Sequence, residues 1–260
     1  VHNRPALAVA AAGSHPLAER PRDLLIEIDW AHARMVTPTE YVVAIRRSQR
    51  YVPGQAGDIA RIFGEYETLK SRRQVVDLDD LIIKVVHEMD KDSNFADAVR
   101  WRFKHLFVDE AKDMNPLQFA LFESIRGGRS DVFVVGDPLQ AIYGWNGADR
   151  KIFDSLPEII TQSTILKLPN NYRCSPQILE VARQVVRRAN EPVDIRATKD
   201  DGPSVRLIEC VDVATETTAI VNALWEYAPT GGAQPWQSCA VLVRTNNQIE
   251  PILAALAKAN

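Results

Sequence analysis

The chain has 260 residues, of which 46% are hydrophobic and 25% charged, and its formal net charge is −3 at pH 7. These values are typical of an ordinary globular protein, and the length suffices for one large domain or two smaller ones. The charge excludes a uniformly basic surface, but it leaves room for a local groove of Lys and Arg that binds nucleic acid.

The sequence shows no signs of a disulfide-rich or membrane-spanning protein. The three cysteines lie far apart, and neither they nor the five histidines have the spacing of a disulfide framework or a zinc site. No apolar run approaches the roughly 18 residues of a membrane span. The run ALAVAAAG (6–13) is followed by a charged segment, and the sequence begins with Val1. We therefore expect a cytoplasmic protein whose sequence here is a central piece of a longer chain.

The first part of the chain has the pattern of helices. Within residues 20–75, apolar side chains recur at helical spacing up to Met35, and a new helix is expected to start near Pro38. Residues 77–89 (DLDDLIIKVVHEM) predict a stronger helix, because Asp77 is a suitable N-cap and acidic residues occupy the first turn.

Short β-rich runs follow. Residues 105–110 (HLFVDE), 131–137 (DVFVVGD) and 164–168 (TILKL) are typical of buried parallel strands. The segment between the first two predicts a helix that begins near Pro116 and ends at Gly127. This order of strand, helix and strand predicts a right-handed βαβ unit.

The second half repeats the alternation of helices and strands. A helix is expected over residues 175–190, and residues 190–204 are typical of a linker. The next elements are expected to be a strand at 205–211, a helix at 214–227, a strand at 239–244 and a helix at 247–258. This order predicts the start of a second parallel-sheet domain.

Two of the predicted strands end in acids. Asp109 and Glu110 follow the first strand, and Asp137 follows the second. Ligands of parallel α/β sheets bind outside the carboxyl ends of the strands, where an Asp is well placed to hold the Mg²⁺ of a nucleotide. A following Glu can polarise the water that attacks a γ-phosphate. The alternative is that these acids simply mark where the chain reaches solvent.

Three further polar or aromatic residues suit a nucleotide site. The amide of Gln140 can donate to a phosphate oxygen and accept from a water at the same time. Arg173 precedes the helix that opens the second α/β segment, and an arginine there can reach phosphate charge. The ring of Tyr172 can stack on a nucleobase. The alternative for Tyr172 and Arg173 is a helix-entry turn with a packed ring and a surface charge.

Three segments resemble motifs of one enzyme family in both order and spacing. VDEAKDMNPLQ (108–118), VVGDPLQAIYGWNGAD (134–149) and LPNNYRCSPQIL (168–179) resemble motifs II, III and IV of the UvrD/Rep/PcrA group of superfamily 1 DNA helicases. The likeness covers roughly residues 75–260. EIDWAHARMVTPTEYV (27–42) more loosely resembles the inserted helical subdomain of actinobacterial members.

The resemblance implies an α/β fold, the RecA-like parallel sheet of P-loop NTPases. Residues 1–73 would form part of an inserted helical subdomain, residues 74–173 the C-terminal part of the first motor domain, and residues 174–260 the start of a second RecA-like domain. The implied activity is ATP-driven 3′→5′ movement along single-stranded DNA with duplex unwinding, in DNA repair or replication. ATP and Mg²⁺ are the implied cofactors, and single-stranded DNA and its junctions with duplex are the implied partners.

The resemblance also implies roles for individual residues. Asp109 would hold Mg²⁺ and Glu110 would be the catalytic base, while Gln140 would contact the γ-phosphate with Asp137 on the same nucleotide-facing side. Tyr172 would stack on adenine and Arg173 would contact the γ-phosphate. Trp145 would be the platform on which bases stack. The DNA-facing residues would be Tyr143, Trp145, Asn146, Arg244, Thr245 and Asn246.

The sequence departs from the family in two ways. The phosphate-binding P-loop, GxxxxGK[ST], and the later arginine-bearing motif are absent, so we expect the isolated chain not to hydrolyse ATP. Motif II usually reads Asp-Glu-aromatic-Gln-Asp, and here Ala111 and Lys112 replace the aromatic residue and the glutamine. Lys112 thereby adds a fixed positive charge near the expected phosphates.

Two alternatives to a helicase remain open on the residues alone. The first is a module with a helicase-like fold that binds single-stranded DNA without hydrolysis. The second is a two-metal nuclease or phosphohydrolase built on Asp109, Asp113 and Asp137, which would cleave without nucleotide.

Overall fold

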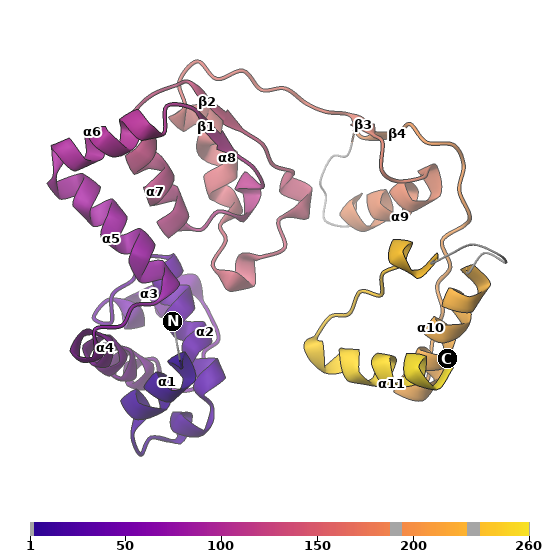
Figure 1. Cartoon of the computed structure of the whole chain (residues 1–260), viewed down its shortest axis with the longest axis horizontal. Coiled ribbons are helices and arrows are strands. Elements are labelled where there is room, and N and C mark those ends of the chain that lie inside the picture. The colour runs from indigo at the N-terminus through magenta and orange to yellow at the C-terminus, as the bar shows by residue number, and fades with distance from the viewer. Residues whose placement is uncertain (1–2, 188–193, 228–234, 260) are drawn as a thin grey trace. The chain divides into compact units, whose positions relative to one another are not determined.

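The computed structural model describes residues 3–187, 194–227 and 235–259, and the chain divides into two compact units, Val1–Lys167 and Leu168–Asn260 (Figure 1). Most of the described residues are helical, and the strands form two small parallel sheets. None of the helices in these ranges is long and apolar enough to cross a membrane.

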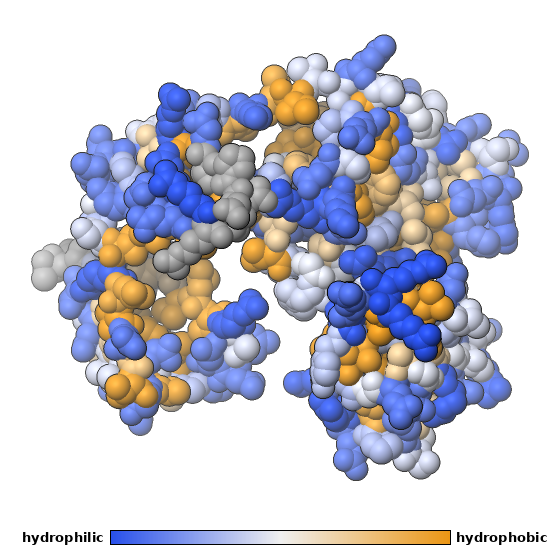
Figure 2. All heavy atoms as spheres, turned by 180° about the vertical axis from the view of Figure 1, so that it is seen from behind, coloured by the Kyte–Doolittle hydropathy of each residue, from blue (hydrophilic) through white to orange (hydrophobic). Residues whose placement is uncertain are grey.

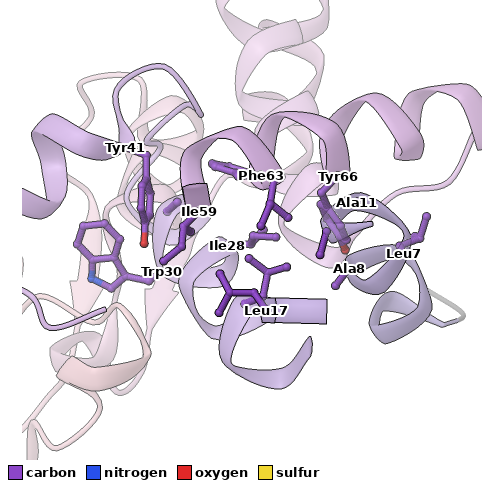
Figure 3. Packing of buried hydrophobic residues seen from close by; sticks show 14 of the residues in the cluster. Leu7, Ala8, Ala11, Leu17, Ile28, Trp30, Tyr41, Ile59, Phe63 and Tyr66 are labelled. Atoms are coloured by element: carbon purple, nitrogen blue, oxygen red, sulfur yellow. The ribbon is translucent and has the colours of Figure 1, made fainter. Parts of the chain in front are cut away.

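The first unit opens with a layer of helices that has its own core. Its elements are α1 (Arg4–Ala12), η1 (Pro16–Glu19), α2 (Pro21–Ala33), α3 (Tyr41–Ser48) and α4 (Ala56–Arg73). Figure 3 shows Ile28, Ile59 and Phe63 gathered inside this layer, and all three are at most 1% exposed. The rings of Tyr41 and Phe63 meet edge to face with centroids 6.5 Å apart, a favourable aromatic geometry.

A buried carboxylate in this layer is fully paired. Glu27 of α2 is 3% exposed, and its carboxylate accepts hydrogen bonds from the Tyr41 hydroxyl at 2.8 Å and from Arg50 Nη2 at 3.0 Å. Burying a charge is tolerated only when it is paired in this way. The helices expected within residues 20–75 are confirmed.

One helix start in this layer differs from the expectation. The helix expected to begin near Pro38 begins instead at Tyr41. The carboxylate of Glu40 accepts hydrogen bonds from both the backbone N–H (3.1 Å) and the hydroxyl (2.7 Å) of Thr37. This is half of a capping-box arrangement, and residues 38–40 form a turn that leads into the helix.

A helix and a short βαβ unit follow. The helix α5 (Leu78–Lys91) confirms the prediction, with Asp77 as its N-cap, and the Asp77 N–H donates to Asp80 Oδ2 at 2.6 Å. After α6 (Ser93–Arg102) come β1 (Leu106–Val108), η2 (Ala111–Asp113), α7 (Pro116–Arg126) and β2 (Val132–Val134). The two strands are parallel and in register. The predicted strand–helix–strand order is therefore confirmed.

Helix α7 has the ends that its sequence predicts. Pro116 is the first helical residue, and Asn115 before it forms a reciprocal capping box with Gln118. Gly127 ends the helix at a φ of 59°, in the left-handed region that glycine adopts without strain.

Among the described residues of this unit, the strands are covered on one face only. Phe122 of α7 and Leu156 of α8 (Arg150–Ile159) pack with the inner side chains of β1 and β2. On the outer face Phe107 is 76% exposed and Phe133 56% exposed, with ring centroids 5.9 Å apart. The prediction of fully buried strands is thus wrong for this face.

The third predicted strand, at residues 164–168, is also wrong. This run is an exposed connection in which Leu166 is 77% exposed. A parallel strand needs a neighbouring strand to satisfy its backbone groups, and the described residues offer this run no such neighbour.

The second unit contains three predicted helices and one small sheet. The helices α9 (Pro176–Arg187), α10 (Val213–Tyr227) and α11 (Ile249–Ala259) confirm the helical predictions. The strands β3 (Asn170–Asn171) and β4 (Arg196–Ala197) pair in parallel. β4 lies within the segment expected to be a linker, of which residues 190–193 are outside the described residues.

The two strands predicted in this unit are wrong for the same reason as residues 164–168. Residues 205–211 and 239–244 have no partner strand among the described residues, and they are irregular. Their side chains are consequently exposed, with Leu207 at 99% and Leu242 at 92%. Figure 2 shows that apolar residues reach the surface of the protein between hydrophilic ones.

Candidate functional site

The acids that follow β1 and β2 lie on adjacent turns at one edge of the sheet. Val135 joins these turns, because its N–H donates to Val108 O at 2.8 Å and its C=O accepts from Ala111 N at 2.9 Å. The hydrogen bonding therefore continues one residue beyond β2 and joins Val135 to the turn that follows β1. It places the turn that carries Asp109 beside the turn that carries Asp137, as the topology of a parallel sheet requires.

Asp109 and Glu110 are both exposed at this edge. Glu110 has a φ of 53°, a left-handed conformation that is uncommon for a residue other than glycine. Its N–H donates to Asp109 Oδ1 at 2.9 Å. This bond orients the Asp109 carboxylate, which is a hard oxygen ligand of the kind that Mg²⁺ takes together with substrate phosphates. The donor chemistry of Asp109 thus fits Mg²⁺.

Lys112 forms an ion pair with Glu110, the residue that the sequence predicts as the catalytic base. Its ammonium lies 2.5 Å from Glu110 Oε2 and 2.7 Å from Asp113 Oδ2, and the residue is only 4% exposed. Hydrogen bonds with Asp113 and then Glu110 raise the pKa of Lys112 above its ordinary value. Lys112 therefore stays charged at neutral pH and holds Glu110 in an ion pair. The sequence indicated the added charge, but it did not indicate this contact.

Asp137 organises the turn after β2. Its Oδ1 accepts from Leu139 N at 3.0 Å and caps η3 (Pro138–Gln140), while its Oδ2 accepts from Gln140 Nε2 at 2.7 Å. Both carboxylate oxygens thus serve the turn itself. Gln140 is exposed with its amide oriented by Asp137, which leaves the amide oxygen available as an acceptor.

The aromatic residues of the same segment lie on the surface. Tyr143 is 46% exposed and Trp145, in η4 (Gly144–Asn146), is 61% exposed. Their ring centroids are 6.3 Å apart with an interplanar angle of 53°. A core role for Trp145 is therefore excluded, and its ring is available for stacking. The side chain of Asn146 lies outside the described part of the structure.

The aromatic segment rests on the C-terminal end of α2. Gly147 has a φ of +95°, and a Cβ added there would lie 2.7 Å from Ala33 Cβ. Next to it, Arg34 Nη1 lies 3.7 Å from Asp149 Oδ2, and Asp149 N donates to Met114 O at 3.0 Å. Sequence reasoning missed this contact, for which the only local signal was the glycine after Trp145-Asn146.

Tyr172 and Arg173 belong to the second unit, in the turn between β3 and α9. Asn171 Oδ1 accepts from the N–H groups of Arg173 (2.9 Å) and Cys174 (2.8 Å), which fixes the turn. Both side chains are exposed, and Tyr172 is 71% exposed. These two residues thus belong to a different unit from Asp109, Glu110 and Gln140.

The predicted DNA-contacting segment of the second unit precedes η6 (Asn246–Gln248). Gln248 Oε1 accepts from the N–H groups of Arg244 and Thr245, both at 3.0 Å. Thr245 is the N-cap of η6, and Arg244, Thr245 and Asn246 are exposed. Gln248, which orders this turn, was not among the predicted site residues.

Two family models match most of this chain. Residues 22–160 match the family model of the UvrD/REP helicase N-terminal domain, and residues 166–260 match that of the UvrD-like helicase C-terminal domain. The ATP-dependent DNA helicase UvrD2 of Mycobacterium tuberculosis (strain ATCC 25618 / H37Rv) is 30% identical in an alignment 262 residues long, gaps included. The alignment covers 98% of this chain and 37% of that protein.

A second group of relatives is more distant. The ATP-dependent DNA helicase PcrA of Staphylococcus aureus (strain NCTC 8325 / PS 47) is 26% identical over 204 residues, which cover 78% of this chain and 28% of that protein. The chain thus spans about a third of the length of the curated relatives that it matches.

Proposed function

Because this chain belongs to the UvrD/Rep helicase family, a family of ATP-dependent DNA helicases, we propose that it is the central part of a 3′→5′ motor that moves on single-stranded DNA and unwinds duplex. We place its activity in DNA repair or replication, with single-stranded DNA and its junctions with duplex as substrates.

We assign the three segments of the chain as follows. Residues 1–73 are part of an inserted helical subdomain, residues 74–173 are the C-terminal part of a RecA-like motor domain, and residues 174–260 start a second one. The separate core of α1–α4 supports the first assignment. The parallel β1 and β2, packed against α7 and α8, support the second.

One observation carries the proposal: a single segment brings a polar group at the sheet edge together with an exposed aromatic surface. Gln140 is oriented by Asp137 beside the turn of Asp109, while Trp145 lies exposed five residues further along the chain. Base stacking on an aromatic ring contributes about 1–3 kcal/mol and tolerates any base, which suits movement along arbitrary sequences.

The residues at the sheet edge would divide the work of hydrolysis. Bound ATP with Mg²⁺ would supply the γ-phosphate that is transferred to water. Asp109 would hold the cation, and Glu110 would accept a proton from the attacking water. Gln140 would contact the γ-phosphate, and Tyr172 and Arg173 of the second unit would bind adenine and the γ-phosphate.

The DNA contacts would be made by both units. Tyr143 and Trp145 would carry bases, with Asn146 beside them. The exposed Arg244, Thr245 and Asn246, ordered by Gln248, would contact the strand from the second unit. Since only a few residues separate Gln140 from Trp145, a shift at the phosphate would be passed directly to the bases.

The two alternatives, a two-metal nuclease and a DNA-binding module without hydrolysis, require different residues. A two-metal nuclease would need Asp113 as a metal ligand, but its carboxylate is paired with the ammonium of Lys112 at 2.7 Å. A DNA-binding module without hydrolysis would keep Trp145 and would have no use for Glu110.

The test compares Trp145→Ala and Glu110→Gln in the full-length protein. We expect Trp145→Ala to weaken single-stranded DNA binding by about 5- to 150-fold, as the loss of about 1–3 kcal/mol from one stacked base predicts, and to leave ATP binding unchanged. Glu110→Gln should abolish DNA-stimulated ATP hydrolysis and retain DNA binding. Unchanged DNA affinity in Trp145→Ala would contradict the platform. A full-length protein without ATPase activity would favour the non-hydrolysing module.

A further inference from the structure

A buried histidine in the helical layer has one ring nitrogen with no partner. His32 of α2 is 5% exposed, and its Nε2 lies 3.0 Å from Glu67 Oε1 on α4. Its Nδ1 is buried and has no hydrogen-bond partner among the described residues. Leaving a buried polar atom without a hydrogen bond costs about 1–3 kcal/mol, so a ligand bound at this nitrogen would stabilise the folded chain.

Two carboxylates complete a cluster around this histidine. Asp29 lies one turn earlier on α2, and Asp79 lies in the first turn of α5. One ligand atom from each of Asp29, His32 and Asp79 lies within 4.8 Å of the others. Asp79 has no hydrogen bond or ion pair with any described residue, and burial raises its pKa. The carboxylate of Asp29 is held in place by an ion pair with Arg4.

We propose that Asp29, His32 and Asp79 form a binding site for a divalent transition-metal ion such as Zn²⁺, through Nδ1 of the imidazole and one oxygen of each carboxylate. Glu67 would accept a hydrogen bond from Nε2–H and so keep the lone pair on Nδ1. Histidines that bind metals nearly always donate their other N–H to a carboxylate or carbonyl in this manner.

The opposite side of the histidine does not offer a comparable site. His32, Glu67 and Asp80 also come within 4.8 Å of one another. However, the ammonium of Lys70 lies 2.9 Å from Glu67 Oε1 and 2.8 Å from Asp80 Oδ2. This cation is paired with both of those carboxylates. In the proposed site Arg4 is paired with Asp29, but among the described residues no cationic side chain is paired with Asp79.

The ligand set selects the class of ion. One imidazole and two carboxylates suit Zn²⁺ and its first-row neighbours, with water completing a four-coordinate site. Mg²⁺ prefers six oxygen ligands in an octahedron. Zinc–ligand bonds of about 2.0–2.2 Å require the three side chains to draw together by rotation. The bound ion would then connect α2 with α5.

The experiment uses the 260-residue chain, freed of metal with a chelator. We expect titration calorimetry with Zn²⁺ to show binding at one site that Mg²⁺ at the same concentration does not reproduce. Saturating Zn²⁺ should raise the Tm by on the order of 5 °C, because the ion binds the folded state only. Co²⁺ should give a visible absorption band from a low-symmetry site.

The deciding variant is Asp79→Asn, with Glu88→Gln as its control on the exposed side of the same helix. Since Asp79 has no partner, the metal-free variant should unfold at the wild-type Tm or slightly above it. We expect Asp79→Asn to weaken Zn²⁺ binding at least about tenfold and Glu88→Gln to leave it unchanged. Absence of Zn²⁺ binding by the wild type, or equal binding by Asp79→Asn, would overturn the proposal.

Discussion

The ammonium of Lys112 lies 2.5 Å from Oε2 of Glu110, so the carboxylate proposed as the catalytic base is already engaged in an ion pair. Asp113 holds the same ammonium at 2.7 Å. A carboxylate in a charge-assisted hydrogen bond is less free to reorient toward a water. Hydrolysis would therefore require Glu110 to leave Lys112.

Substitution of Lys112 should consequently speed hydrolysis. In the full-length protein we expect Lys112→Gln, which restores the usual residue of motif II, to raise the rate of DNA-stimulated ATP hydrolysis several-fold. The measurement is kcat and KM for ATP at saturating single-stranded DNA. Lys151→Gln removes an exposed lysine and should leave both constants unchanged. A fall in kcat for Lys112→Gln would show that the ion pair positions Glu110 productively.

The contact between Gly147 and Ala33 leads to a second prediction. Gly147→Ala places a methyl group 2.7 Å from Ala33 Cβ at a φ of +95°, which costs about 1–3 kcal/mol of stability. The shifted loop should also lower the affinity for single-stranded DNA, because it carries Trp145. Urea unfolding and fluorescence anisotropy with a labelled oligonucleotide measure the two effects.

Gly128 provides a matched control for this substitution. It has a φ of +80°, but an added Cβ meets nothing within 4 Å. Gly128→Ala should therefore lower the free energy of unfolding only by the cost of the left-handed backbone conformation, and it should leave the affinity for DNA unchanged. Equal loss of DNA affinity in both variants would mean that the contact with Ala33 does not position the loop.

The carboxylate of Asp80 predicts a pH-dependent contribution to stability. Burial alone would raise the pKa of Asp80, but hydrogen bonds from Lys70 and from the Asp77 backbone outweigh it and lower the pKa below the ordinary carboxyl value. Because the pKa of Asp80 is lower in the folded state than its value of about 4 in the unfolded state, the charged carboxylate stabilises the protein at pH values above about 4. This contribution is lost as the pH falls through the folded-state pKa.

Asp80→Asn should therefore destabilise the chain by about 1 kcal/mol at pH 7, the usual cost of losing a helix-capping carboxylate. The difference from the wild type should shrink as the pH is lowered below about 4. Urea unfolding at pH 7 and at successively lower pH measures it, with the exposed Asp90→Asn as the control. A difference that is constant with pH would exclude the charge as its cause.

The helices could be predicted because their signals are local. Asp77 before α5, and Pro116 and Gly127 at the ends of α7, occupy the positions that capping rules assign to them. The strand predictions depended on partners that an apolar run does not specify. Residues 106–108 and 132–134, which α7 separates in the sequence, pair as parallel strands. Residues 205–211 have no partner strand among the described residues.

In the candidate site, too, some features could be predicted from the sequence and others could not. The neighbouring positions of Asp109 and Asp137 follow from parallel topology alone. The cluster of Asp29, His32 and Asp79 could not be predicted, because its members lie on two helices far apart in sequence and lack any metal-binding spacing. The ion pair of Lys112 depends on a left-handed φ at Glu110, which a motif does not reveal.

The close approach of Gly147 to Ala33 limits which residues position 33 can hold. The Cβ of Ala33 already reaches the space that a side chain at position 147 would fill. Any larger residue at position 33 would push against the backbone that carries Tyr143 and Trp145. The last turn of α2 is remote in sequence from the three helicase motifs. The size of its residue 33 would thus determine how far Tyr143 and Trp145 lie from the helical layer.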